Sequence, residues 1–192
     1  MRANLGLAGL LLFSSYCWDA PAQTPSAAST EKTDRLLVYG ENFAFGVKEP
    51  EGWRGDTGEL ANSYHVNIVF VPIGEAVDAK GITIRVRVNS KVDENTIEDL
   101  KYDMAQYKKD YPKAQFGDLS ISHPEYKTFA ELVYVPRQFF EYVAYVNPGP
   151  RPKFTFSVAM SKKVTEATPD ELKAFQTVLQ SLAWIPTADK KK

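Results

Sequence analysis

The residues of this chain that could do acid–base chemistry or bind a metal are few and scattered. His65 and His123 are its only histidines. A histidine can act as a general base or a metal ligand, because its pKa lies near neutrality and its neutral ring binds metals. Neither histidine has a second histidine or a carboxylate at ligand spacing. We therefore expect both to be solvent-facing or structural, and we expect no metal site.

The sequence also lacks the motifs that mark a nucleophile or a phosphate-binding loop. It contains no H-E-x-x-H, G-x-S-x-G or P-loop pattern. Its single cysteine, Cys17, falls in an N-terminal segment that we expect to be removed, so the mature chain would have no thiol nucleophile and no disulfide. We predict that the protein is not an enzyme, with no catalytic residue and no cofactor.

A partner-binding surface is predicted from three side chains. Arg85 and Arg87 lie two residues apart in a strand-like stretch, so both point to one face of a sheet. Trp53, in a loop, is the third residue of this predicted surface. Two alternatives remain open. The arginines could form cross-strand ion pairs with Glu131 and Glu141, worth about 0.2–1 kcal/mol each, and Trp53 could be a lid over the edge of the core.

Aromatic residues in the second half of the chain leave a further alternative open. They could line a pocket for a small apolar ligand held between the sheet and a helix. Aromatic residues on both faces of central strands more often pack in a core under helices. The residues in question are Phe139, Phe140, Tyr142, Tyr145, Phe154 and Phe156.

The charge composition favours neither nucleic acid nor an anionic membrane as a partner. The chain has 23 Lys and Arg residues against 24 Asp and Glu residues, a net charge of −1. Its only basic cluster, Lys190 to Lys192, lies at the C-terminal end and is expected to be a solvated tail.

Strand patterns occupy much of the chain. The stretch 64–71 is apolar on both faces, so we expect it to be covered on both sides, whereas 82–88 is apolar on one face only and should show the other to water. Short connections favour antiparallel neighbours. Further strands are predicted at 43–47, 129–135, 139–146 and 154–160, and a weaker one at 116–122.

Two helices are expected. The first has Asn95 or Thr96 as its N-cap and ends at Pro112. The second begins with Thr168, Pro169 and Glu171, which supply a capping hydroxyl, a first-turn proline and a capping-box carboxylate. Their apolar stripes are Ile97, Leu100, Met104, Tyr107 and Tyr111 in the first, and Leu172, Phe175, Val178, Leu179 and Leu182 in the second. Together these elements predict an α+β fold, a mostly antiparallel β-sheet flanked by helices.

The N-terminal residues predict export. A basic start, an apolar run from Leu5 to Phe13 and the small residues Ala20 and Ala22 are typical of a cleaved signal peptide. We expect a signal peptide at 1–22, a flexible leader at 23–34, a single domain at 35–187 and a basic tail at 188–192. The protein would then be periplasmic or secreted, with no transmembrane segment in the mature chain. A lipid anchor on Cys17 is the alternative.

The order of these elements resembles the PsbP-like family. The resemblance rests on the strand Phe43 to Val47, on Pro50 to Trp53 and on the helix motif from Phe175 to Ser181, and it covers Leu36 to Ile185. It implies an α-β-α sandwich, the fold also found in a yeast Ran-binding import factor and in chaperones of type VI secretion effectors. Members of the family are mostly non-enzymatic and bind other proteins or membrane complexes.

Residues and resemblance together lead to one hypothesis and two alternatives. The hypothesis is an exported, non-enzymatic binding or accessory protein that acts through a protein–protein surface, its partner being another protein. A carrier of a small apolar ligand is the first alternative, and a hydrolase with an unrecognised site is the second.

Overall fold

Ten strands and three helices are described in the computed structural model, which covers residues 35–74, 81–91, 96–150 and 152–186. These ranges belong to one compact unit, residues 34–192. The predicted signal peptide, the leader at 23–34, Cys17 and the tail at 188–192 lie outside the described residues. Within the described ranges, no helix combines the length and the apolar character that crossing a membrane requires.

Two sheets are present, and every pair of neighbouring strands in them is antiparallel. The order in the larger sheet is β3-β4-β5-β9-β8-β7-β6, and in the smaller sheet it is β1-β2-β10. The large sheet consists of β3 (Trp53–Asp56), β4 (Ile68–Pro72), β5 (Thr83–Ser90), β6 (Gln115–Asp118), β7 (Lys127–Val135), β8 (Phe139–Asn147) and β9 (Phe154–Lys163). The small sheet consists of β1 (Leu36–Tyr39), β2 (Ala44–Val47) and β10 (Ala183–Ile185).

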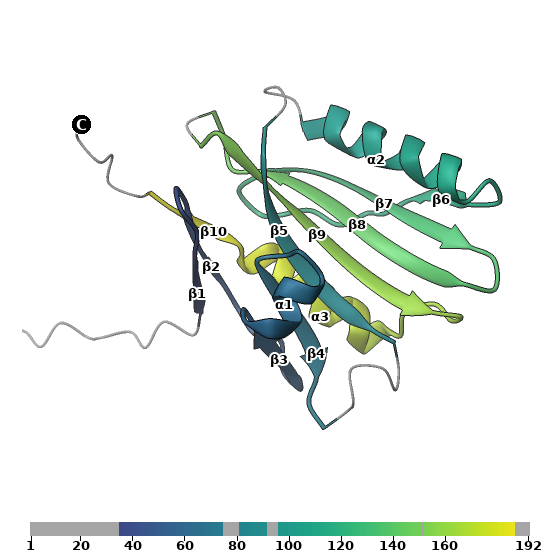
Figure 1. Ribbon diagram of the computed structural model, residues 1–192, viewed down its shortest axis with the longest axis horizontal. Helices are drawn as coiled ribbons and strands as arrows, with labels where there is room; N and C mark the ends of the chain where they lie inside the picture. The colour runs from purple at the N-terminus through teal and green to yellow at the C-terminus, as the bar shows by residue number, and fades with distance from the viewer. Residues whose placement is uncertain (1–34, 75–80, 92–95, 151, 187–192) are drawn as a thin grey trace, which may run out of the picture. The chain divides into compact units, whose positions relative to one another are not determined.

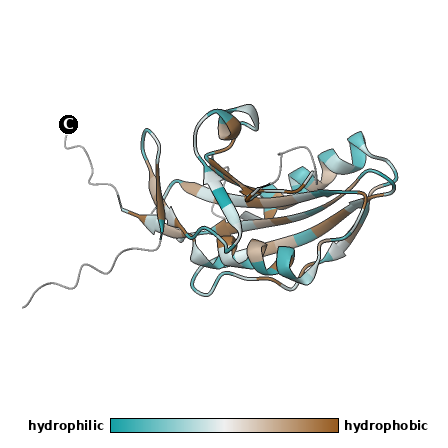
Figure 2. Ribbon diagram, turned by 90° about the horizontal axis from the view of Figure 1, so that it is seen from below, coloured by the Kyte–Doolittle hydropathy of each residue, from teal (hydrophilic) through white to brown (hydrophobic). Residues whose placement is uncertain are grey.

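One face of the large sheet carries the main core. A register row on this face runs through Phe70, Ile84 and Met160, all of them fully buried. The helix α3 (Pro169–Ser181) packs on it with Phe175, which is 0% exposed. The small sheet contributes Phe45 to the same cluster. In Figure 2, brown apolar residues dominate the strands that build this core.

The opposite face is covered by two separate helices. The short helix α1 (Glu59–Ser63) packs Ala61 on Val69 and Val71, at the β4 side of the sheet. The longer helix α2 (Thr96–Asp110) packs Leu100 and Met104 on β7 and β8. Figure 1 shows β5 and β9 running between these two helices. Neither helix covers the centre of this face, and that gap positions the site described below.

The predicted fold class is confirmed. The capping box predicted at Thr168 is present, because its side chain accepts from the Glu171 amide and the Glu171 carboxylate accepts from the Thr168 amide. The first predicted helix is α2, and it ends at Asp110, two residues before Pro112. Asn95, one of its two proposed caps, lies outside the described residues.

The strand predicted at 64–71 begins later than expected, at Ile68. The preceding residues belong to α1 and to its following turn, in which His65 has a left-handed backbone with φ of 53°. The helix α1 was not predicted from the sequence, because a helix of five residues is too short to show a period. Burial on both faces is confirmed for β4, as is one-sided burial for β5.

Candidate functional site

The candidate site is a groove over β5 and β9, on the face between α1 and α2. Its floor is made by alternate residues of the two strands, which share one face by register. On β9 these residues are small, Ser157, Ala159 and Ser161. On β5 they are Thr83, Arg85, Arg87 and Asn89. Because the β9 side chains on this face are short, they leave space between the larger side chains of the neighbouring strands β5 and β8.

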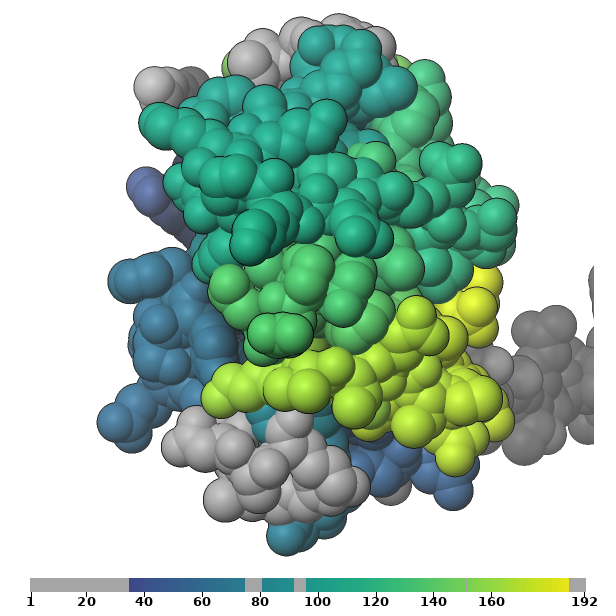
Figure 3. All heavy atoms as spheres, turned by 90° about the vertical axis from the view of Figure 1, so that its right-hand side faces the viewer, coloured from purple at the N-terminus to yellow at the C-terminus, as the bar shows by residue number. Residues whose placement is uncertain are grey.

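Three hollows follow one another along the floor and share lining residues. Their volumes are about 470, 140 and 660 Å³. The first two share Arg85 and Glu141, and the second and third share Arg87 and Ser157. Figure 3 shows one end of this face, with the blue atoms of the α1 region on one side and the teal atoms of α2 on the other. The hollows therefore form one groove rather than three unrelated pockets.

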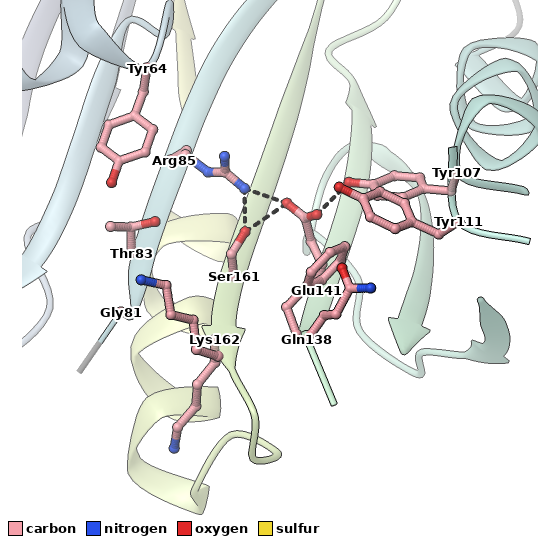
Figure 4. Close-up of a pocket in the computed structure, with 12 residues that line it drawn as sticks. Tyr64, Gly81, Thr83, Arg85, Tyr107, Tyr111, Gln138, Glu141, Ser161 and Lys162 are labelled. Atoms are coloured by element: carbon pink, nitrogen blue, oxygen red, sulfur yellow. Dashed lines mark hydrogen bonds and ion pairs between the residues drawn. The ribbon is translucent and has the colours of Figure 1, made fainter. Parts of the chain in front are cut away.

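Tyrosines form much of the wall. Tyr64 follows α1 on one side, and Tyr107 and Tyr111 come from the α2 side, as Figure 4 shows. Tyr102 on α2 and Tyr145 on β8 line the far end. Half of the ten tyrosines of the chain thus line the groove.

A hydrogen-bonded network crosses the floor. The Arg85 guanidinium pairs with the Glu141 carboxylate and also bonds to Ser161. Ser161 donates to the same carboxylate at 2.8 Å, and the Tyr107 hydroxyl donates to its other oxygen. The guanidinium also lies 5.8 Å from the centre of the Tyr64 ring. The network therefore links the α1 side of the groove to α2 through the strands (Figure 4).

The surroundings of the groove shift the pKa of two of its side chains, Tyr107 and Asp103. Burial, followed by the charge of Glu141, raises the pKa of Tyr107 far above its ordinary value. At the other end, burial and then the neighbouring Asp99 raise the pKa of Asp103, while Arg87 opposes the shift. The carboxylate of Asp103 accepts from the Tyr145 hydroxyl. These groups are held as donors and acceptors within the chain, not as free bases.

The two predicted surface arginines both line the groove, and Trp53 does not. Arg85 forms an ion pair with Glu141, as the alternative reading expected, whereas Glu131 takes no part in it. Arg87 is exposed, and no carboxylate in the described ranges lies within ion-pair distance of it. Trp53 is the first residue of β3 and not, as was expected, part of a loop. It is 8% exposed and packs in the main core, as the lid alternative predicted.

Neither histidine lines the groove. His65 lies exposed in the turn after α1. His123 is buried, its Nε2 donates to the Leu182 carbonyl at 2.8 Å, and its Nδ1 accepts from the Glu125 and Tyr126 amides at 3.0 Å. Burial lowers the pKa of His123, partly opposed by the Leu182 carbonyl. Its role is structural, since it ties the loop before β7 to the end of α3.

The six aromatic residues considered as a ligand pocket are divided between the two faces. Tyr142 and Phe156 belong to the main core, and Phe154 stacks on Trp184. Phe140 stacks on Tyr134 at the β7 side. Phe139 and Tyr145 line the groove.

The groove residues Tyr107, Ser157 and Ser161 were not predicted from the sequence. The available signal was in β9, whose residues alternate between large apolar side chains and small ones over residues 156–161. One face of such a strand packs in the core, and the small side chains on the other face leave space above the sheet. Tyr107 was assigned to the apolar stripe of its helix, so the hydrogen bond from its hydroxyl to Glu141 was not expected.

No model of a known protein family matches this chain, and no curated protein matches it either. Within the described ranges, no group of three or more His, Cys, Asp or Glu side chains is arranged to hold a metal ion.

Proposed function

We propose that this chain is an exported, non-enzymatic binding or accessory protein, and that it binds a segment of another protein in the groove over β5 and β9. The observation that carries the proposal is the gap between α1 and α2. A polar strip of two central strands stays accessible there, whereas helices cover the strands on either side. Export rests on the N-terminal sequence, from Met1 to Ala22.

The dimensions of the groove suit an extended polypeptide. The floor from Thr83 to Asn89 is about 20 Å long at about 3.3 Å per residue, which corresponds to about six residues of an extended chain. A small-molecule site is commonly one concave pocket that buries most of its ligand. Three linked hollows along a strand instead provide successive positions for side chains.

The composition of the groove supports a protein partner. Tyrosine presents a large apolar ring and a polar hydroxyl, and it is enriched at protein interfaces. The lining also includes charged residues of both signs. A polypeptide with mixed side chains can complement such a surface better than a uniformly charged polymer can.

The chemistry of the network supports a non-catalytic role. The Glu141 carboxylate already accepts from Arg85, Ser161 and Tyr107, so it has little capacity to take a proton from a substrate. Ser161 has no histidine beside it to activate its hydroxyl. A hydrolase remains the less favoured alternative.

The apolar-ligand carrier is also less favoured. The space between the large sheet and α3 is occupied by the side chains of the core itself, among them Phe45, Phe156 and Phe175. Membership of the PsbP-like family is part of this proposal and rests on the short motifs around Pro50 and Phe175. An accessory role on another protein is what that resemblance implies.

Site-specific photo-crosslinking tests the proposal. A photoreactive phenylalanine analogue replaces Tyr102 or Tyr111 in the groove, and Gln176 on the exposed side of α3 serves as the matched control. In the source cells, the two groove positions should yield the same protein adduct, and position 176 should not. Adducts from position 176 alone, or a lipid retained by the purified protein in native mass spectrometry, would contradict the proposal.

A further inference from the structure

The end of the groove next to the β7–β8 turn is positively charged. Three cationic residues, Arg85, Lys162 and Lys163, and one acidic residue, Glu141, line the hollow of about 470 Å³ at this end. At the other end, Arg87 and Lys101 face three carboxylates, on Glu98, Asp99 and Asp103. The groove is therefore electrically asymmetric along its length.

Lys163 is the cation available to a ligand. Arg85 is neutralised by Glu141, and Lys162 pairs with Glu171 of the α3 capping box at 2.6 Å. No carboxylate in the part of the chain that the structure describes pairs with Lys163. Its aliphatic stem lies across Gly81, where an added Cβ would come within 2.7 Å of the Lys163 Cδ. The Lys163 stem therefore lies beside Gly81, and both residues line the hollow.

Neutral donors surround the same hollow. Four side chains line it whose polar groups make no hydrogen bond to any described residue: Tyr64, Thr83, Tyr111 and Gln138. The Nε–H of Arg85 is buried and likewise finds no acceptor in the described ranges. A buried donor without an acceptor is unfavourable, so a ligand oxygen at this position would be stabilised.

We infer that the Lys163 end of the groove binds the side-chain carboxylate of an Asp or Glu in the bound segment. This inference rests on the proposed function. Lys163 supplies the charge, and the hydroxyls, the Gln138 amide and the Arg85 Nε–H supply the hydrogen bonds. The acidic end of the groove excludes the same carboxylate by repulsion. The anionic residue of the partner is thereby assigned to the Lys163 end.

A side-chain carboxylate fits better than a C-terminal one. Capture of a chain terminus typically uses unpaired backbone N–H groups. The strands here pair with each other over the whole stretch from Thr83 to Ser90, so their amides are engaged within the sheet. The hollow instead offers side-chain donors without a hydrogen-bond partner in the described ranges, among them the Arg85 Nε–H.

A peptide-display experiment tests this inference. Random twelve-residue segments are displayed inside a loop, so that no free C-terminus is offered, and are selected on the purified chain. Enriched segments should carry Asp or Glu at one fixed position. A synthetic peptide with that residue changed from Glu to Gln should bind at least tenfold more weakly.

Variants of the chain separate recognition of charge from general damage to the groove. Lys163→Gln should weaken the Glu peptide about tenfold and leave the Gln peptide unchanged, and Lys173→Gln on exposed α3 should change neither. Equal weakening of both peptides by Lys163→Gln would overturn the inference.

Amide chemical shifts distinguish a failure of the carboxylate inference from a failure of the proposed function. Selected segments that shift the Ser157 and Ala159 amides but carry no fixed acidic residue would refute the carboxylate site and leave the groove as a binding surface. Segments that never shift these amides would contradict both.

Discussion

Arg85 and Glu141 form an ion pair although their strands are not neighbours. β9 lies between β5 and β8, and Ser161 on β9 bonds to both charged groups. The pair can reach across a strand because the side chain between them is small and can itself hydrogen-bond. Their side chains are 24% and 9% exposed, so the pair is less screened by water than a surface pair.

The first prediction concerns this pair. Removing one partner leaves a partly buried charge, so Glu141→Gln should lower the free energy of unfolding by about 1–3 kcal/mol. The double variant Arg85→Met with Glu141→Gln should recover part of that loss, because neither charge is then left without a partner. Urea unfolding of the four species in a double-mutant cycle measures the coupling.

Glu98 and Lys101 provide the matched control. They form an ion pair at 2.9 Å, with side chains that are 52% and 63% exposed. Their coupling should be below about 0.5 kcal/mol. Equal coupling in the two pairs would contradict the role assigned to burial.

The second prediction concerns Phe175. Its ring is 0% exposed between α3 and the sheet, so Phe175→Ala should cost about 3–5 kcal/mol. Gln176→Ala, one residue further on the exposed side, should cost less than about 0.5 kcal/mol. Thermal and urea unfolding give both values. A chain ending before Thr168 should be insoluble, and cooperative melting of that shortened chain would show that α3 is dispensable.

The third prediction is a pH dependence from His123. Burial lowers the pKa of the folded histidine below its usual value of about 6.5. As the pH falls below about 7.5, the unfolded chain takes up a proton that the folded chain refuses, so stability falls, by at most about 1.4 kcal/mol per pH unit. Above that range the ring is neutral in both states and contributes no pH dependence.

The change His123→Gln isolates this contribution. Protonation of Nδ1 would remove the acceptor of two backbone amides, and the variant cannot titrate in this range. Unfolding free energies of both proteins between pH 5 and 8 should converge as the pH falls. Parallel curves would mean that His123 does not cause the dependence.

The fourth prediction concerns the N-terminus. Ala20 and Ala22 predict cleavage after Ala22, so the protein recovered outside the cytoplasm should begin at Gln23. N-terminal sequencing or intact-mass measurement checks this. A mature protein that begins with a lipid-modified Cys17 would contradict cleavage and make the protein membrane-anchored.

Local sequence patterns determined most of the elements of this fold. Two-residue alternation located β5, β7, β8 and β9, and the capping box at Thr168 located the start of α3, because these signals arise within a few residues of chain. The same alternation placed Arg85 and Arg87 on one face. It also predicted correctly that β4 is buried on both sides and β5 on one.

Only the tertiary structure decided which residues meet on that face. Whether Arg85 meets a partner or a carboxylate depends on the strand order, which places β9 between β5 and β8 and brings Glu141 within reach. The groove exists because α1 and α2 cover the two sides of the sheet and leave its centre accessible. Such contacts join residues far apart in the chain, so no short stretch of sequence contains them.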